Sequence, residues 1–283
     1  MTVRVLRPAT LAEALARLAE SRCTVLAGGT DLLVRHRTAA GALPDLPGDV
    51  LLVGRLDALR GIARDGGALR VGAAATFAEL LESPLVPDLW KEPFASVGSP
   101  AVRNVGTIGG NVANASPAGD SLPLLAALDG VLLLQSARGE RMVPFRDFHL
   151  GPGRTALAPD ELLVALRLPL LPHDRGVWWK VGPRRANAVS KLSFLGLAAV
   201  EDGIVRDARM ALGAVAPTVV RVPQAETLLA GLRAVDVPAA ADRVLALLSE
   251  AIRPIDDVRS TRAYRREVSL RLARRFLEEV LPR

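Results

Sequence analysis

The pattern of hydrophobic and polar residues predicts that the chain begins with a strand, a helix and a second strand. Residues 1–8 alternate in the manner of a short strand. Thr10 and Glu13 have the spacing of a capping box, which predicts a helix that ends at about Glu20. The apolar residues of this helix share one face: Leu11, Leu15 and Leu18. The apolar run 24–27 then predicts a short strand.

Further apolar runs predict strands and short helices as far as residue 172. The strands are expected at 51–54, 69–73, 131–135, 141–145 and 161–168. Helices are expected to begin after Thr76 (a second capping box), after Ser99 and at Leu122. The turn at Arg138-Gly139 is expected to join two of the strands in a hairpin. Pro169 and Pro172 mark the end of this region.

A second region follows, with strands first and helices afterwards. Trp178 opens a strand, and the runs 194–200 and 204–212 flank Asp202-Gly203, which is a strong hairpin signal. Helices are expected at 225–230, 239–252 and 260–280. The last of these has an apolar stripe of Val268, Leu272, Phe276 and Val280. Its arginines off the stripe are expected to face solvent: Arg262, Arg265, Arg266 and Arg271. The alternative is that this basic face contacts an acidic partner subunit.

Composition and charge exclude several classes of protein. Half of the 283 residues are hydrophobic, so the chain is expected to fold, and no apolar run is long enough to span a bilayer. The N-terminal residues lack an apolar signal segment, which favours a cytoplasmic protein. The net charge of +6 comes almost wholly from arginine, and stacking aromatics are scarce. We therefore expect no membrane span and no nucleic-acid partner.

The residues that usually hold metals are scarce. Cys23 is the only cysteine, so it cannot form an intrachain disulfide or hold an iron–sulfur cluster. The three histidines are scattered along the chain: His36, His149 and His173. We expect no metal site and no Cys–His catalysis. Any redox chemistry would need an organic cofactor.

Two glycine motifs carry the candidate chemistry. The central one, residues 106–111, reads Gly-Thr-Ile-Gly-Gly-Asn, and an upstream partner, residues 27–32, reads Ala-Gly-Gly-Thr-Asp-Leu after an apolar strand. Glycines that take positive φ can present successive free N–H groups to a phosphate. The two motifs therefore suggest one ligand with several phosphates, held from two sides. The upstream motif can also be an ordinary strand-to-helix turn, and it lacks the lysine of a P-loop.

Asp120 stands before the helix expected at Leu122. As an anion it is better suited to accept hydrogen bonds from ligand hydroxyls, such as those of a ribose, than to meet phosphate. The alternative is that Asp120, or Ser121, simply caps the helix.

Taken together, residues 27–32, 102–111 and 115–120 resemble the FAD-binding medium subunit of molybdenum hydroxylases, the family of carbon monoxide dehydrogenase and xanthine dehydrogenase. The stretch 180–184 with Lys191 resembles the start of that family's C-terminal domain. The resemblance implies an α+β fold. A two-subdomain FAD-binding region of the vanillyl-alcohol-oxidase/PCMH type, residues 1–172 (subdomains about 1–54 and 55–172), would precede a C-terminal domain, 173–283, of antiparallel strands plus a helical bundle.

The resemblance also implies which residues bind FAD. Those expected to hold the pyrophosphate are Leu26, Ala27, Gly28, Gly29, Thr30, Leu32, Thr107, Ile108, Gly109, Gly110 and Asn111. Asp31 would lie near the flavin without a chemical role, Asp120 would bind ribose and Leu163 would pack on the adenine. Val97 falls where some relatives have an aromatic residue. Lys180 would contact the cofactor near the flavin, or would be an ordinary surface lysine.

By the same resemblance, the chain would carry out one step of a shared reaction. A molybdenum-cofactor large subunit and a [2Fe–2S] small subunit would be its partners, and FAD would pass electrons to an external acceptor. No catalytic side chain is expected. Two alternatives stay open: a free-standing FAD-dependent oxidoreductase of the same fold, and a non-enzymatic nucleotide-binding or assembly protein.

Overall fold

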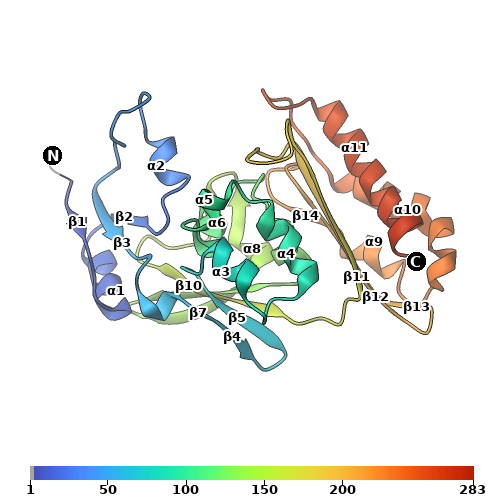
Figure 1. Cartoon of the computed structure of the whole chain (residues 1–283), viewed down its shortest axis with the longest axis horizontal. Helices are drawn as coiled ribbons and strands as arrows, with labels where there is room; N and C mark the ends of the chain where they lie inside the picture. Colours follow the sequence, from blue (N-terminus) through green and yellow to red (C-terminus); the bar gives the residue numbers. More distant parts are fainter. Residues whose placement is uncertain (1–2) are drawn as a thin grey trace. The chain divides into compact units, whose positions relative to one another are not determined.

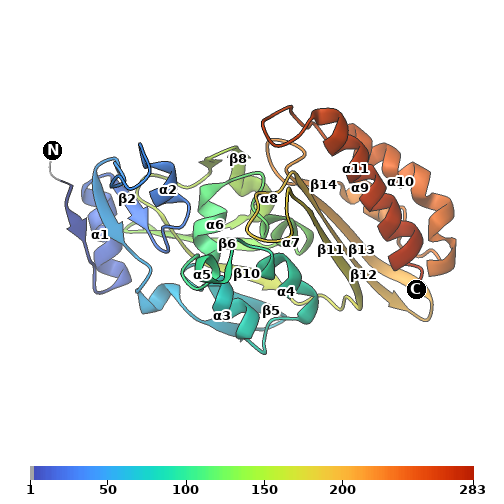
Figure 2. The same ribbon diagram turned by 45° about the horizontal axis from the view of Figure 1, so that its top comes forward.

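The computed structural model describes residues 3–283, which form two compact units (Figures 1 and 2). The first unit contains the chain up to Val86 together with Ser99–Ala115 and Gly130–Pro169. The second contains Pro87–Gly98, Ser116–Asp129 and Leu170–Arg283. The units are therefore discontinuous in sequence, since two segments from before residue 172 pack within the second unit.

The first unit begins with a three-stranded parallel sheet in the order β1-β3-β2. Its strands are β1 (Val5–Leu6), β2 (Cys23–Leu26) and β3 (Asp49–Leu52), and α1 (Leu11–Glu20) crosses between the first two. The Thr10 side chain accepts from the backbone N–H of Glu13, as the capping-box pattern predicts. The strand expected over 1–8 is confirmed only at Val5–Leu6, and residues 1–2 lie outside the described part of the chain.

The first unit also contains a five-stranded antiparallel sheet. Its order is β4 (Ile62–Asp65), β5 (Ala68–Gly72), β10 (Leu162–Pro169), β6 (Val131–Ser136) and β7 (Gly139–Pro144). The expected hairpin at Arg138-Gly139 is confirmed, since β6 pairs with β7 from Ser136 opposite Gly139 onwards. The central strand β10 is buried along most of its length, which explains its nearly continuous apolar run.

Short helices accompany the sheets of the first unit. They are α2 (Leu32–Arg35), a 3₁₀ turn at Asp57–Leu59, α3 (Phe77–Glu82), α5 (Pro100–Arg103), α6 (Ile108–Asn114) and α8 (Phe145–Phe148). A small ribbon of β8 (His149–Gly151) and β9 (Arg154–Thr155) follows α8. The predicted helix starts are confirmed at Thr76, which forms a complete capping box with Glu79, and at Ser99.

The second unit contains an antiparallel sheet, labelled β11 to β13 in Figure 1 with β14 at its edge. The strands are β11 (Arg175–Val181), β12 (Leu192–Glu201), β13 (Ile204–Gly213) and β14 (Val220–Arg221). Asp202 and Gly203, with φ of 52° and 73°, make the predicted hairpin turn between β12 and β13. The predicted pairing of these two strands is confirmed.

The helices of this unit are α4 (Asp88–Ala95), α7 (Leu122–Ala127), α9 (Pro223–Thr227), α10 (Val237–Ala251) and α11 (Arg262–Arg275), with a 3₁₀ turn at Ala234–Asp236. One π-helical turn, Phe276–Val280, continues α11. A Cβ at Gly196 of β12 would lie 2.6 Å from the Phe276 ring, so the ring packs directly on the strand backbone. Among the described residues, no helix is long and apolar enough to cross a membrane.

The expectation that Arg265 faces solvent is wrong. Its side chain is buried, and its guanidinium donates to the Asp257 carboxylate at 2.5 Å and to the Ala214 carbonyl at 3.1 Å. The buried face of α11 follows Arg265, Ser269 and Ala273, rather than the apolar stripe alone. A charged group is tolerated there because an acidic partner and a carbonyl accept from its two terminal nitrogens, although its buried Nε meets no acceptor among the described residues.

Candidate functional site

The two glycine motifs lie against each other in the first unit. A Cβ at Gly28 would lie 1.9 Å from the Val105 carbonyl oxygen, and one at Gly106 would lie 3.4 Å from the Thr30 hydroxyl. No side chain larger than hydrogen fits at position 28 without moving backbone. The fold thus brings together two motifs that are far apart in the sequence.

The first motif is the source of unused backbone donors. It connects the end of β2 at Leu26 to α2, which begins at Leu32. Within residues 3–283 the backbone N–H groups of Gly28, Gly29, Thr30 and Asp31 meet no protein acceptor. Gly29 has a φ of +70°, a conformation that favours glycine. Successive free N–H groups in such a turn can surround an anion, as the sequence predicted.

The second motif is not the nest of free donors that its glycines suggested. The residue Thr107 caps α6, and its side chain accepts from the N–H of Gly110 at 3.1 Å. The N–H groups of Ile108 and Gly109 donate to the carbonyls of Ala75 and Ala73. None of the motif's glycines has a positive φ. The expectation of free N–H groups here is therefore wrong, because a capped helix and the strand end use these donors.

Close packing explains one glycine of the second motif, Gly109, but not its neighbour Gly110. A Cβ at Gly109 would lie 2.5 Å from both the Cβ and the carbonyl oxygen of Ala73. Gly110, by contrast, is exposed, and a Cβ there would meet only the Thr107 hydroxyl, at 2.8 Å. Gly110 is thus the glycine whose missing side chain leaves an open surface for a ligand.

An arginine that the sequence did not single out joins the two motifs. Arg35 of α2 donates to the Asp31 carboxylate at 2.9 Å and to the side-chain oxygen of Asn114, at the end of α6, at 2.5 Å. Asp31 and Arg35 are four residues apart, a spacing that does signal a helical ion pair. The contact with Asn114 has no such signal, because it depends on the tertiary fold.

In the second unit, Asp120 accepts two side-chain hydrogen bonds. The Nζ of Lys180 donates to Oδ2 at 2.6 Å, and the Ser190 hydroxyl donates to Oδ1 at 2.7 Å. Lys180 also donates to the Ser96 carbonyl at 2.8 Å. The N-cap residue of α7 is Ser121, as one of the two alternatives predicted, although its side chain makes no capping bond; Asp120 is not the N-cap residue. Lys180 is not a surface lysine either, since its side chain is 13% exposed.

The surroundings of Asp120 act on its charge in opposite directions. Burial raises the pKa of its carboxyl, whereas the Lys180 ammonium and the hydrogen bond from Ser190 favour the ionised form. A carboxylate has about four lone-pair positions, so these two bonds do not exhaust its capacity to accept a ligand hydroxyl. Ser190, which is fully buried, is the partner that sequence reasoning missed.

The other predicted residues occupy ordinary structural positions. Leu163 lies in β10 opposite Leu134 and is 7% exposed. Leu26 ends β2 and Leu32 begins α2. Val97 follows α4, and its N–H donates to the Phe94 carbonyl at 3.2 Å.

The structure brings no group of possible metal ligands together among residues 3–283. Two histidines use their ring nitrogens locally: His149 meets the Val112 carbonyl at 2.8 Å, and His173 meets the Asp207 carboxylate at 2.8 Å. The chemistry of the donor set is thus that of an anion and hydroxyl site, and it fits an organic cofactor with phosphates.

Comparison with known proteins agrees with this chemistry. Residues 1–171 match the family model described as the FAD binding domain in molybdopterin dehydrogenase, and residues 178–280 match the CO dehydrogenase flavoprotein C-terminal domain. The chain is 36% identical over 230 residues to a putative xanthine dehydrogenase FAD-binding subunit of Escherichia coli, covering 78% of this chain and 76% of that one. It is 29% identical over 277 residues to the carbon monoxide dehydrogenase medium chain of Hydrogenophaga pseudoflava, covering 95% and 94%.

Solved structures match over the whole chain. A chain of the reconstituted CO dehydrogenase from Oligotropha carboxidovorans superimposes with a TM-score of 0.90 at 27% identity, covering 100% of this chain and 99% of that one. A chain of quinoline 2-oxidoreductase from Pseudomonas putida 86 gives 0.88 at 25% identity, covering 99% and 97%.

Proposed function

Because the chain belongs to the family of FAD-binding subunits of molybdenum hydroxylases, we propose that it carries electrons through FAD between a reduced partner subunit and an external acceptor. FAD is its cofactor, and the chain is an FAD-dependent subunit of an oxidoreductase. The α+β fold, with its FAD-binding region and its C-terminal domain of antiparallel strands and helices, is that of the CO dehydrogenase medium subunit.

The observation that carries the proposal is the contact between the two glycine motifs. Four free backbone N–H groups, Gly28 to Asp31, lie beside a capped helix whose exposed face includes Gly110. Free N–H groups suit the charged oxygens of a pyrophosphate, and a bare glycine lets a ligand approach closely. We assign the pyrophosphate chiefly to the first motif, and we propose that Thr107 to Asn111 contact it from the other side.

The remaining assignments follow what the family resemblance implies for each position. We assign Asp120 to a ribose hydroxyl, Lys180 to the region of the flavin and Leu163 to the adenine. The ion pair between Asp120 and Lys180 would hold both side chains in place before the cofactor binds. Asp31, which is exposed and paired with Arg35, keeps the place near the flavin that the resemblance gives it.

Bound FAD would supply the redox chemistry, and the protein would supply binding, orientation and exclusion of water. The proposed partners are a [2Fe–2S] small subunit and a molybdenum-cofactor large subunit, in a cytoplasmic hetero-oligomer. The single cysteine of this chain agrees with that division of labour, since cluster ligands would lie on another chain.

A reduction experiment tests the electron-transfer role. The FAD-loaded chain is co-expressed and purified with its iron–sulfur subunit, the clusters are reduced under anaerobic conditions, and the flavin absorbance is followed by stopped flow. The proposal predicts that the flavin is bleached as the clusters are reoxidised. Clusters that stay reduced beside an oxidised flavin would contradict it and would favour a free-standing oxidoreductase or an assembly protein.

A further inference from the structure

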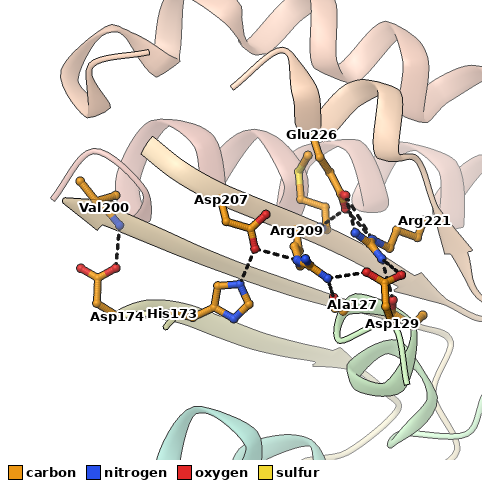
Figure 3. Close-up of polar contacts among 11 residues, drawn as sticks. Ala127, Asp129, His173, Asp174, Val200, Asp207, Arg209, Arg221 and Glu226 are labelled. Atoms are coloured by element: carbon orange, nitrogen blue, oxygen red, sulfur yellow. Dashed lines mark hydrogen bonds and ion pairs between the residues drawn. The ribbon is translucent and has the colours of Figure 1, made fainter. Parts of the chain in front are cut away.

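A network of charged side chains binds the C-terminal end of the helix that follows Asp120. The helix α7 begins two residues after Asp120 and ends at Ala127. Arg209 donates to the carbonyl of Ala127 at 2.8 Å (Figure 3). Arg221 donates to the carbonyl of the preceding residue, Ala126, at 3.1 Å. Cationic groups at a helix C-terminus satisfy its free carbonyls and interact favourably with its dipole.

One carboxylate ties the two arginines together. Asp129 accepts from Arg209 on Oδ2 and from Arg221 on Oδ1, each at 2.6 Å. Arg209, Arg221 and Asp129 are called the α7 clamp below. Each arginine of the clamp is itself fixed, because Glu226 holds Arg221 at 2.9 Å and Asp207 holds Arg209 at 2.7 Å (Figure 3).

The other end of the same segment is also attached to the sheet. The N–H of Ala214, just beyond β13, donates to the Pro117 carbonyl at 2.8 Å. A Cβ at Gly213 would lie 3.3 Å from the Pro123 side chain, so α7 packs closely on the end of β13. The stretch from residue 117 to 129 is therefore held to the strand at both ends, and Asp120 lies between the two attachments.

Stability alone does not explain this arrangement. Both arginines of the clamp are 15% exposed, but the Asp129 side chain that joins them is 52% exposed, and ion pairs that water reaches usually add little to stability. Such a network does fix the position of the helix end, because the hydrogen bonds between a guanidinium and a carboxylate form only in a narrow range of geometries. Asp120 needs a fixed geometry in order to meet both Lys180 and a ligand.

We propose that the α7 clamp positions Asp120 for binding the cofactor. Arg209, Arg221 and Asp129 are positioning residues that act through α7. The inference rests on the proposed role of Asp120, and it adds three residues to the determinants of FAD affinity.

The test combines FAD affinity with a double-mutant cycle in the full-length chain. FAD dissociation constants are measured by flavin fluorescence for the wild type, Asp129→Asn, Asp120→Ala and the double variant. Asp129→Asn is expected to raise the dissociation constant about tenfold, the effect of about one lost charged hydrogen bond. In the Asp120→Ala background the same change is expected to have no further effect.

Arg206→Gln is the matched control, since Arg206 lies on the same strand and its ion pair with Glu201 is exposed. It is expected to leave the affinity unchanged. Arg209→Lys is a second clamp variant that keeps the charge but not the forked geometry, and it should behave as Asp129→Asn does. Unchanged affinity in both clamp variants, or equal effects with and without Asp120, would overturn the inference.

Amide hydrogen exchange separates this inference from the proposed function. Asp129→Asn is expected to speed exchange in residues 117–121 of the cofactor-free chain, and Arg206→Gln is not. A wild-type chain that takes up no FAD would contradict the proposed function. The exchange rates of residues 117–121 would then be the test of whether the α7 clamp holds this segment in place. Exchange at 117–121 that does not change in Asp129→Asn would overturn the clamp even in a chain that binds FAD normally.

Discussion

The Nζ of Lys180 lies 2.6 Å from Oδ2 of Asp120, and the two side chains are only 13% and 10% exposed. Removing one member of such a pair leaves an uncompensated charge out of reach of water. Lys180→Met is therefore expected to lower the free energy of unfolding by about 3 kcal/mol in urea titrations. The double variant with Asp120→Asn should recover part of that loss, because it removes the stranded charge.

The pair between Lys91 and Asp88 is the matched control. Its distance is 2.9 Å, but the Asp88 side chain is 95% exposed. Lys91→Met should cost less than about 1 kcal/mol, as is usual for surface pairs. Equal losses in the two lysine variants would mean that Asp120 and Lys180 are not a buried pair.

Asp120→Ala is expected to weaken FAD binding by about 1–3 kcal/mol, the usual cost of leaving buried polar groups without their partner. In this variant Ser190 loses its acceptor, and Lys180 keeps only the Ser96 carbonyl. Calorimetric titration with FAD gives the affinity directly. An unchanged affinity would show that Asp120 serves only the packing of the second unit.

Adjacent glycines of the second motif are expected to respond differently to substitution. Gly109→Ala places a Cβ against the backbone of Ala73 and should destabilise the fold by about 1–3 kcal/mol. Gly110→Val displaces only the Thr107 cap, at a cost of about 1 kcal/mol, but covers the proposed pyrophosphate surface and should abolish FAD binding.

Thermal melts and FAD content together check this contrast, with Gly67→Ala as a control because its Cβ would meet nothing within 4 Å. A Gly110→Val protein that purifies with normal flavin content would remove the pyrophosphate from this place.

Acid is expected to destabilise the protein through Asp207. Burial opposes its ionisation, but hydrogen bonds from His173 and Arg209 prevail and lower the pKa of Asp207 to about 2. Because this folded-state pKa lies below the usual value of 3.8, the stabilisation is complete above pH ~4 and is lost as the pH falls toward ~2.

With allowance for partial exposure of the side chain, the contribution is about 1 kcal/mol. Unfolding titrations of the wild type and of Asp207→Asn should therefore differ at pH 5 and converge at lower pH. A difference that is constant over this range would assign the effect to packing.

Local patterns predicted most of the elements near their observed bounds. The Asp202-Gly203 turn, the capping box at Thr76 and the helix start at Ser99 depend on neighbouring residues alone, and the structure confirms them. The sequence pattern does not predict α4, because this helix is short and contains Pro93, and proline disfavours the interior of a helix.

The site was predictable only in part, because its details are tertiary. Three glycines in the second motif suggested positive φ, but Gly109 is required by the approach of Ala73, a residue far away in sequence. The ion pair of Asp120 with Lys180 likewise joins strands and loops that no local pattern connects. Helical spacing places Arg265 off the apolar stripe and so predicts that it faces solvent. The spacing cannot predict its ion pair with Asp257, because Asp257 lies in the turn before the helix.

The absorption spectrum of the purified chain tests the central claim most directly, with the released cofactor identified after denaturation. The account predicts the two visible bands of an oxidised flavin, and it predicts that the released compound is FAD. A colourless chain that binds added FAD also agrees with it, since the cofactor can be lost on purification. A colourless chain that takes up no added FAD would contradict the assignment of the glycine motifs as a pyrophosphate site.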